Sequence, residues 1–255
     1  MERFSADEFF EITHLLGKFD QAPVLNDSPL SASSALVTGW IPDLKKRCEA
    51  IGLRQTAKHV SRIHSELLKG KTKLSEFQKM IPEIRFRIKD EMEDKLFMYV
   101  PSPRAERYDL IEPFGTGVAG KFPSCSYDAK EAGSCFAGAR FTACVFHLMR
   151  VLEIGLLAFA RLFPAVPTDK ENWQQIIEKI ESEIRDMPKS ATKASDWKEK
   201  QEKYSQIANS FMFFKDAWRN YTAHARGKYT EDEADLIYRN VSKFMQGLAA
   251  QGLSE

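Results

Sequence analysis

Residues 197–225, WKEKQEKYSQIANSFMFFKDAWRNYTAHA, decide the fold class of this chain. Apolar and aromatic side chains recur there at steps of four, three, four, three and four residues, which is the period of one helix face. They are Ile207, Phe211, Phe214, Trp218, Tyr221 and Ala225. Gly227 follows at the place where a left-handed glycine typically ends a helix. The stretch therefore predicts a long amphipathic helix.

The residues on both sides of this stretch predict three more helices. Apolar side chains keep helical spacing over residues 134–163 and again over residues 172–187. A capping box at Thr230 and Glu233 begins a further helix that continues to about residue 248. Four successive helices with short joins are typical of an antiparallel bundle. We therefore expect an antiparallel four-helix bundle in residues 120–255.

The residues upstream of position 101 predict a separate helical region. Its helical patterns cover residues 7–19, 35–51, 53–69 and 75–99. We expect the last of these helices to begin with a capping box at Ser75 and to bend at Pro82. Pro, Gly and Ser then cluster over residues 101–133, which indicates a domain boundary. The chain is expected to be all-α, with a regulatory or dimerising N-terminal region at residues 1–115.

Charge and hydropathy indicate which partners and which location the sequence predicts for this protein. The 37 basic and 36 acidic residues leave a net charge of +1, so the chain as a whole has no general attraction to nucleic acid or to an anionic membrane. Residues 1–8 lack the pattern of a secretory signal, and we expect no segment with the roughly 18 to 20 apolar residues of a membrane span. The sequence predicts a cytoplasmic protein without a membrane partner.

The four cysteines predict neither disulfides nor a metal site. Cys48, Cys125, Cys135 and Cys144 show no C-x-x-C spacing and lie in different segments. Cys144 falls within an apolar helical stripe, which favours a buried free thiol. We therefore expect no metal and no cofactor.

The candidate for chemistry is the segment WRNYTAH at residues 218–224. It places Arg219 five residues before His224 near the end of the long helix, with Asn220 directly after the arginine. This R-x4-H pattern resembles the signature of the HEPN superfamily (higher eukaryotes and prokaryotes nucleotide-binding). Residues 140–153, RFTACVFHLMRVLE, similarly resemble the first helix of HEPN-type domains in bacterial proteins. The resemblance covers about residues 120–250, and the N-terminal half resembles no characterised domain.

The resemblance implies a metal-independent endoribonuclease that acts in bacterial defence, in a stress response or in a toxin-type system. In such an enzyme His224 is the general acid and base, Arg219 stabilises charge on the phosphoryl oxygens, and Asn220 orients the pair. HEPN nucleases generally act as dimers with paired motifs at the interface, so we expect a homodimer and an RNA substrate. Arg226 stands where the toxin branch silenced by nucleotidylation has a tyrosine, and that form of control is not expected.

The spacing of the pair limits how one chain can use it. At 100° per residue, five residues leave Arg219 and His224 about 140° apart around an α-helix. Asn220 shares the face of His224 instead. The pair can converge if the helix end unwinds near Gly227, or if the helices of two protomers pack against each other.

Other polar residues are further candidates for binding or orienting RNA. Asp216 lies one turn before Arg219 and either orients its guanidinium or forms an ordinary surface ion pair. His147 and Arg150, with Arg140 two turns earlier, predict a basic stripe that either follows a phosphate backbone or is a solvated face. Arg226 joins this group, and Phe213 lies off the apolar stripe, where it favours an interface or a stacked base.

A second class of function uses the same bundle without catalysis. In this alternative the chain is a catalytically silent helical adaptor that dimerises or binds a protein partner, such as an antitoxin. It predicts that Arg219 and His224 are buried or ion-paired within one protomer, whereas a nuclease needs them in an open, positively charged cleft.

Overall fold

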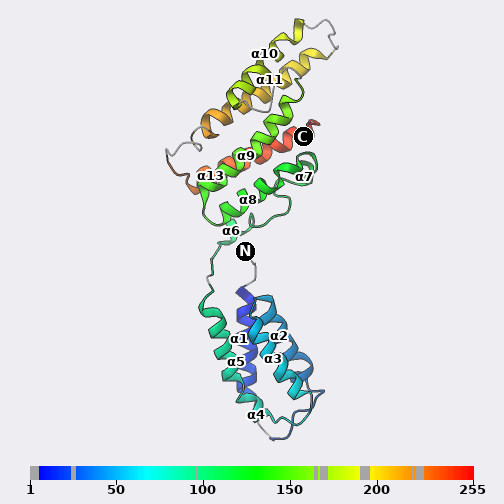
Figure 1. Ribbon diagram of the computed structural model, residues 1–255, viewed down its shortest axis with the longest axis vertical. Coiled ribbons are helices and arrows are strands. Elements are labelled where there is room, and N and C mark those ends of the chain that lie inside the picture. Colours follow the sequence, from blue (N-terminus) through cyan, green and yellow to red (C-terminus); the bar gives the residue numbers. More distant parts are fainter. Residues whose placement is uncertain are drawn as a thin grey trace. The chain divides into compact units, whose positions relative to one another are not determined.

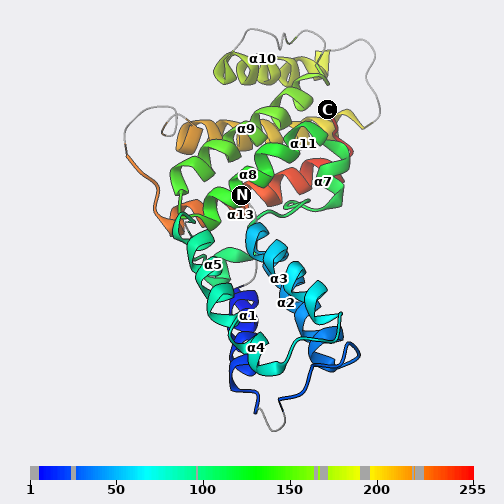
Figure 2. The same cartoon turned by 60° about the horizontal axis from the view of Figure 1, so that its bottom comes forward.

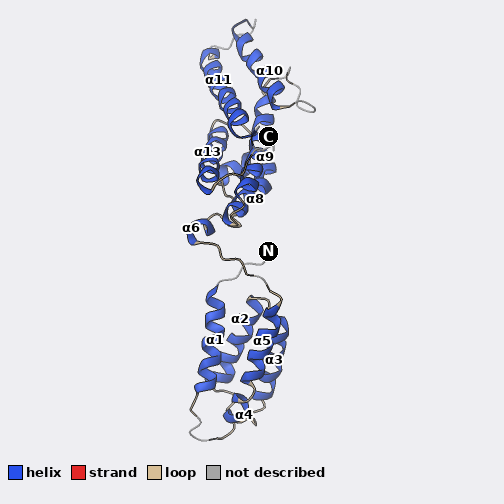
Figure 3. Cartoon of the chain, turned by 90° about the vertical axis from the view of Figure 1, so that its left-hand side faces the viewer, coloured by secondary structure: helices blue, strands red, loops and turns tan. Residues whose placement is uncertain are grey.

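The computed structural model describes residues 6–23, 27–95, 97–163, 166, 172–189, 196–219, 221 and 227–255. Apart from an isolated bridge between Pro29 and Lys73, the regular elements within these ranges are all helices, as Figure 3 shows. The predicted all-α class is confirmed. The chain divides into two compact units, Met1–Met98 and Tyr99–Glu255.

The described residues of the first unit form six helical elements: α1 (Ala6–Gln21), η1 (Leu36–Trp40), α2 (Ile41–Ala50), α3 (Arg54–Leu67), α4 (Leu74–Gln78) and α5 (Ile81–Glu93). Its four longer helices pack in a closed ring, with α1 on α2, α2 on α3, α3 on α5 and α5 on α1. Each of them contributes a fully buried apolar residue to one core: Phe19, Leu44, Val60 and Ile84.

A carboxylate from α5 caps the start of α3. Leu53 precedes α3 and has no side-chain acceptor for the free amides of the first turn. Glu91 takes that role, because its carboxylate accepts hydrogen bonds from the backbone amide of Gln55 (3.0 Å), from the backbone amide of Thr56 and from the Thr56 hydroxyl (2.7 Å). The contact ties α5 to α3 at the edge of the core.

The helix predicted over residues 75–99 is two helices, so that prediction is wrong in its bounds. The backbone amide of Lys73 donates to the Glu76 carboxylate (2.9 Å), and α4 begins at Leu74 instead of after a cap at Ser75. Pro82 is in the first turn of α5, where a missing amide costs nothing, so it begins a helix instead of bending one.

The second unit contains α6 (Ser102–Ala105), α7 (Thr116–Lys121), η2 (Pro123–Cys125), α8 (Ser126–Ala137), α9 (Phe141–Ala160), α10 (Trp173–Asp186), η3 (Met187–Lys189), α11 (Trp197–Phe214), η4 (Lys215–Arg219) and α13 (Glu231–Ala250). The central helix is α9, which packs against α8, α10, η4 and α13. Figures 1 and 2 show it between α10 and α8. One apolar core joins all the long helices of this unit.

The single helix predicted over residues 134–163 is broken into α8 and α9. The amide of Arg140 donates to the carbonyl of Cys135 (2.8 Å) and the amide of Ala139 to that of Phe136 (3.0 Å), which is the pattern of a Schellman cap. Ala139 takes the left-handed conformation, with φ of 55°. The turn at residues 138–140 therefore reverses the chain and lays α8 along α9.

Helix α9 has the length and apolar composition of a membrane span. The expectation that no segment meets that test is therefore wrong for Phe141–Ala160. Most of the helix is buried inside the second unit, where Val145, Leu152 and Phe159 are fully covered by neighbouring helices. Burial in the core accounts for its apolar surface, because a core helix passes the same test.

The chain just before α8 belongs to the second unit, although the sequence places a boundary within residues 101–133. Phe114 and Val118 are buried in the core of this unit. Gly133 of α8 has no Cβ, and an added one would lie 2.5 Å from the carbonyl oxygen of Arg107. The glycine therefore lets the connecting segment lie directly on α8.

Candidate functional site

The R-x4-H segment begins in η4, which directly follows α11, and of its residues the structure describes Trp218, Arg219 and Tyr221. Arg219 is the last residue of the π-helical segment η4, and its side chain is partly buried. Asn220, His224 and Arg226 lie outside the described residues. The angle of about 140° between Arg219 and His224 stays a prediction, because His224 is outside the described residues.

The end of α11 is held against the start of α10 by a buried lysine. Lys215 is 8% exposed, and its ammonium donates to the amide oxygen of Gln174 on α10. The same ammonium pairs with Asp216 (2.7 Å). Asp216, expected beside Arg219, therefore pairs with Lys215. This arrangement fixes η4, and with it the backbone of Arg219.

The guanidinium of Arg219 lies over an aromatic ring of the same unit. Its central carbon is 5.6 Å from the ring centroid of Trp173, which is 2% exposed. Trp173 is the first residue of α10 and lies within the capping box formed by Asn172 and Gln175, so its position is well defined. A cation over an indole face is attracted by the negative face of the ring. The stacking limits the orientations that Arg219 can take.

Gly227 and Tyr229 contact residues of the R-x4-H segment. The Tyr221 hydroxyl lies against Gly227, and the rings of Tyr221 and Tyr229 are 5.3 Å apart. The Tyr229 hydroxyl donates to the carbonyl of Trp218 (3.3 Å). Gly227 is not among the glycines with positive φ in the described part of the chain, so the predicted left-handed cap at this residue is wrong.

The predicted basic stripe converges on a carboxylate of α8. Asp128 is 3% exposed, and one of its oxygens, Oδ1, contacts both His147 Nδ1 (2.8 Å) and Arg150 Nε (2.7 Å). Arg140 precedes α9 in the turn after α8 and is not part of the same helical stripe. His147 and Arg150 thus have a structural partner, and the exposed part of the Arg150 side chain still faces solvent.

Exposed aromatic rings lie beside His147 and beside the η4 segment that contains Arg219. Tyr127 and Phe146 are exposed, and both pack their rings near that of His147, with centroids 6.4 and 6.1 Å away. Phe213, expected off the apolar stripe, is exposed and contacts Trp218 edge to face. Such rings can take a stacked base or a protein partner.

All four cysteines are free and buried, as predicted. Burial raises the pKa of Cys48 and of Cys144 to about 12 and that of Cys125 to about 11. Burial also raises the pKa of Cys135, while the nearby charge of Arg140 acts in the opposite direction. Thiols that hold their protons this firmly are poor nucleophiles.

Sequence reasoning missed one grouping of side chains. The donor atoms of Glu131, Cys135 and His147 lie within 4.8 Å of one another. Cys135 is on α8 and His147 on α9, and no spacing motif joins them in the sequence. Only the turn between the two helices brings them together. No sequence signal marks that turn, because its left-handed position is Ala139 and not a glycine.

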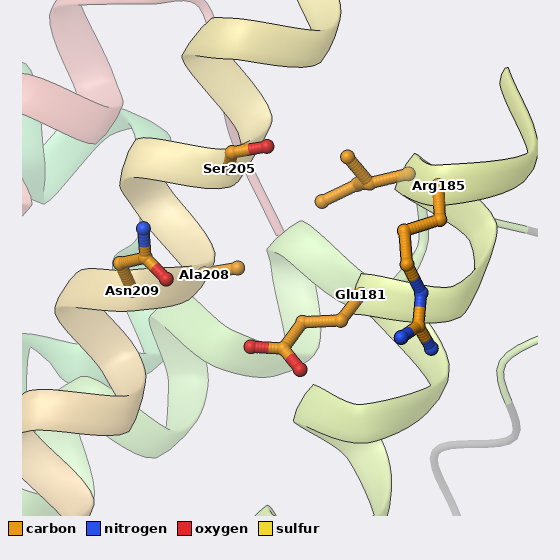
Figure 4. A pocket seen from close by; sticks show the side chains of 6 residues that line it. Glu181, Arg185, Ser205, Ala208 and Asn209 are labelled. Carbon is orange, nitrogen blue, oxygen red and sulfur yellow. The ribbon is translucent and has the colours of Figure 1, made fainter. Parts of the chain in front are cut away.

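A pocket opens between α10 and α11 and is separate from Arg219. Glu181 and Arg185 extend from α10, and Ser205 and Asn209 from α11, as Figure 4 shows. Glu181 is eight residues after Trp173, or about 12 Å further along the helix. The pocket holds no histidine or cysteine, so it offers no group that exchanges protons near neutral pH.

No protein-family model, curated protein or solved structure matches this chain. The functional interpretation therefore depends on the residues of the motif and on the geometry around Arg219.

Proposed function

We propose that the second unit is a metal-independent endoribonuclease of HEPN type, with Arg219 and His224 as its catalytic pair. The observation that carries the proposal is the position of Arg219 at the end of η4, which continues α11, on a backbone fixed by Lys215. The R-x4-H pattern stands at that place in the sequence. The order α9, α10, α11 and α13 agrees with the four-helix arrangement that the resemblance implies.

The proposed chemistry needs one proton carrier and one cation. His224 removes the proton from a ribose 2′-hydroxyl, whose oxygen attacks the adjacent phosphorus while the bond to the 5′-oxygen breaks. An imidazolium returns a proton to the leaving 5′-oxygen, which gives a 2′,3′-cyclic phosphate and a 5′-hydroxyl. Arg219 contacts the phosphoryl oxygens, where negative charge builds up, and its planar fork suits two of them at once.

The remaining predicted residues have supporting positions in this proposal. Asn220 orients His224, and Arg150, Arg140 and Arg226 contact the RNA backbone. A homodimer pairs two copies of the motif, so that one histidine acts as the base and the other as the acid. The first unit then restrains, targets or dimerises the nuclease. The proposed setting is bacterial defence, a stress response or a toxin-type system in the cytoplasm.

The test is cleavage of a mixed RNA pool in EDTA by the wild-type chain, by His224→Ala and by His14→Ala. His14 is an exposed histidine on α1 and gives a matched control for the substitution. We expect cleavage by the wild type and by His14→Ala, with cyclic phosphate ends, and none by His224→Ala with an unchanged circular dichroism spectrum. Cleavage that persists in His224→Ala would overturn the assignment.

The contact between Arg219 and Trp173 favours the second candidate function. A guanidinium partly buried against a ring of its own unit is what a catalytically silent adaptor predicts. The adaptor would use exposed rings such as Phe213 to bind a protein partner, an antitoxin for example. Absence of cleavage by the wild type, together with a dimer that dissociates in Phe213→Ser, would favour it.

A further inference from the structure

We propose that Glu131, Cys135 and His147 bind a zinc ion between α8 and α9. The three side chains supply one oxygen, one sulfur and one nitrogen donor, and these donor atoms lie within 4.8 Å of one another. Sulfur and imidazole donors together select zinc over the hard cations magnesium and calcium, which prefer oxygen alone. The inference does not depend on the ribonuclease proposal.

The backbone on both sides of the site is fixed. Glu131 and Cys135 are four residues apart on α8, so they project from the same side of that helix. The carbonyl of Cys135 accepts the hydrogen bond from Arg140 that closes the turn into α9. His147 lies on α9, which packs along α8. Two ligands from one helix and a third from its neighbour make a site that needs no loop.

The buried Asp128 holds the ring of His147 in an orientation that suits a metal ligand. A charged carboxylate that is 3% exposed costs free energy to bury unless it has partners, and Asp128 has two. One of them is Nδ1 of His147, at 2.8 Å. A metal-binding histidine almost always donates its second ring nitrogen to a carboxylate or carbonyl, which fixes the ring and its tautomer. Here that leaves Nε2 of His147 with a lone pair for zinc.

The distances leave room for an ion after a small adjustment. Tetrahedral zinc holds sulfur, nitrogen and oxygen donors about 3.5 Å apart, since each lies roughly 2.0 to 2.3 Å from the ion. The donors must therefore approach by about an ångström. Glu131 is partly exposed, so its side chain can supply most of that movement. As the zinc–sulfur bond forms, the Cys135 thiol releases its proton to solvent, and water fills the fourth position.

The direct test is titration of chelator-treated full-length protein with Co²⁺, which occupies zinc sites and reports a bound thiolate by its charge-transfer absorption. We expect one Co²⁺ per chain with that band, and its displacement by Zn²⁺. Cys135→Ser should lose the band, whereas Cys125→Ser, a buried cysteine of the same unit, should keep it. A wild type without the band, or a Cys135→Ser variant that keeps it, would overturn the proposal.

Two further variants keep the test informative if Cys135→Ser does not fold. Glu131→Gln changes a partly exposed side chain and should keep the thiolate band while weakening binding. Asp128→Asn should weaken binding by about 10- to 100-fold, the usual effect of losing a carboxylate behind a histidine ligand. Unchanged affinity in both variants would contradict the site. His224→Ala should bind Co²⁺ as the wild type does, so failure of the ribonuclease proposal is seen separately.

Discussion

At the scale of single residues, the surroundings of Arg219 favour a guanidinium over an ammonium. It lies over the indole of Trp173, and a planar group stacks there better than an ammonium does. A lysine would keep the charge but lose both the stacking and the proposed two-pronged contact with phosphate. Replacing Arg219 with lysine therefore separates the effect of the shape of the side chain from the effect of its charge. Replacement with alanine removes both at once.

We predict that Arg219→Lys lowers the rate of RNA cleavage by about 100-fold, as loss of one well-placed donor to a transition state does. The melting temperature should change little, because the lysine chain still covers Trp173. Initial rates on a defined RNA measure the effect. Arg185→Lys, at an exposed arginine of α10, is the control and should cleave at the wild-type rate. Full activity in Arg219→Lys would exclude Arg219 from the reaction.

For single residues, the sequence could predict the R-x4-H motif but not the side-chain contacts that join different helices. Arg219 is recognisable because its partner is five residues away on the same segment. The contacts of His147 with Asp128 and of Lys215 with Gln174 join residues of different helices. No spacing rule predicts such contacts until the helix ends and the packing are known. Sequence reasoning therefore gave His147 a place on a basic stripe and missed its carboxylate partner.

Among the elements, α3 depends on a cap supplied by another helix. Burial, the largest effect, raises the pKa of Glu91, but hydrogen bonds from Thr56 and Gln55 and the charge of Lys95 together lower it below its ordinary value of 4.5. A carboxylate whose pKa is depressed by folding stabilises the folded chain above its unfolded pKa. That contribution is lost as the pH falls through the lower, folded pKa.

We predict that Glu91→Gln destabilises the start of α3 by about 1 kcal/mol at neutral pH, in the range of lost helix caps. Amide hydrogen exchange in the first turn of α3 should become roughly fivefold faster. The difference from wild type should shrink below about pH 4.5, where Glu91 takes up a proton. Glu93→Gln, at an exposed position of the same helix, should show no such change. A difference independent of pH would contradict the capping role.

Two glycines in helix interiors are expected to respond in opposite ways to alanine. An added Cβ at Gly133 would meet the Arg107 carbonyl at 2.5 Å, and backbone cannot move away easily. We predict that Gly133→Ala destabilises the second unit by about 1 to 3 kcal/mol. Gly247 on α13 has no atom within 4 Å of that position, so Gly247→Ala should stabilise by about 0.5 to 1 kcal/mol. Urea denaturation measures the free energy of unfolding of both variants. Equal changes in the two variants would contradict the close approach of Gly133 to the Arg107 carbonyl.

Helix positions were predictable where caps and apolar spacing agree. The predicted capping box at Thr230 is present, and α13 begins directly after it. Helix α10, predicted from residue 172 by its apolar spacing, begins at Trp173. The break between α8 and α9 was not predictable in the same way, because the left-handed position of its cap is Ala139 and not the adjacent Gly138. Glycine normally marks that position, so an alanine there hides the end of a helix.

For the whole molecule, the separate cores predict two units that fold independently. One core is formed entirely by residues of the first unit and the other entirely by residues of the second. Tyr99, at the junction, is 85% exposed. Brief chymotrypsin digestion should therefore cut there and release two fragments, each with helical circular dichroism and cooperative thermal unfolding. Loss of structure in either fragment would show that the units depend on each other.

The two π-helical segments, Leu36–Trp40 and Lys215–Arg219, have a consequence for how this protein can vary in nature. A π turn spans one residue more than the α turn it replaces, so deleting that residue restores a regular helix and leaves the flanking helices in register. Homologous genes are therefore expected to gain or lose a single codon at these two places more readily than elsewhere within the helices. In the second segment such a deletion would change the direction in which Arg219 projects.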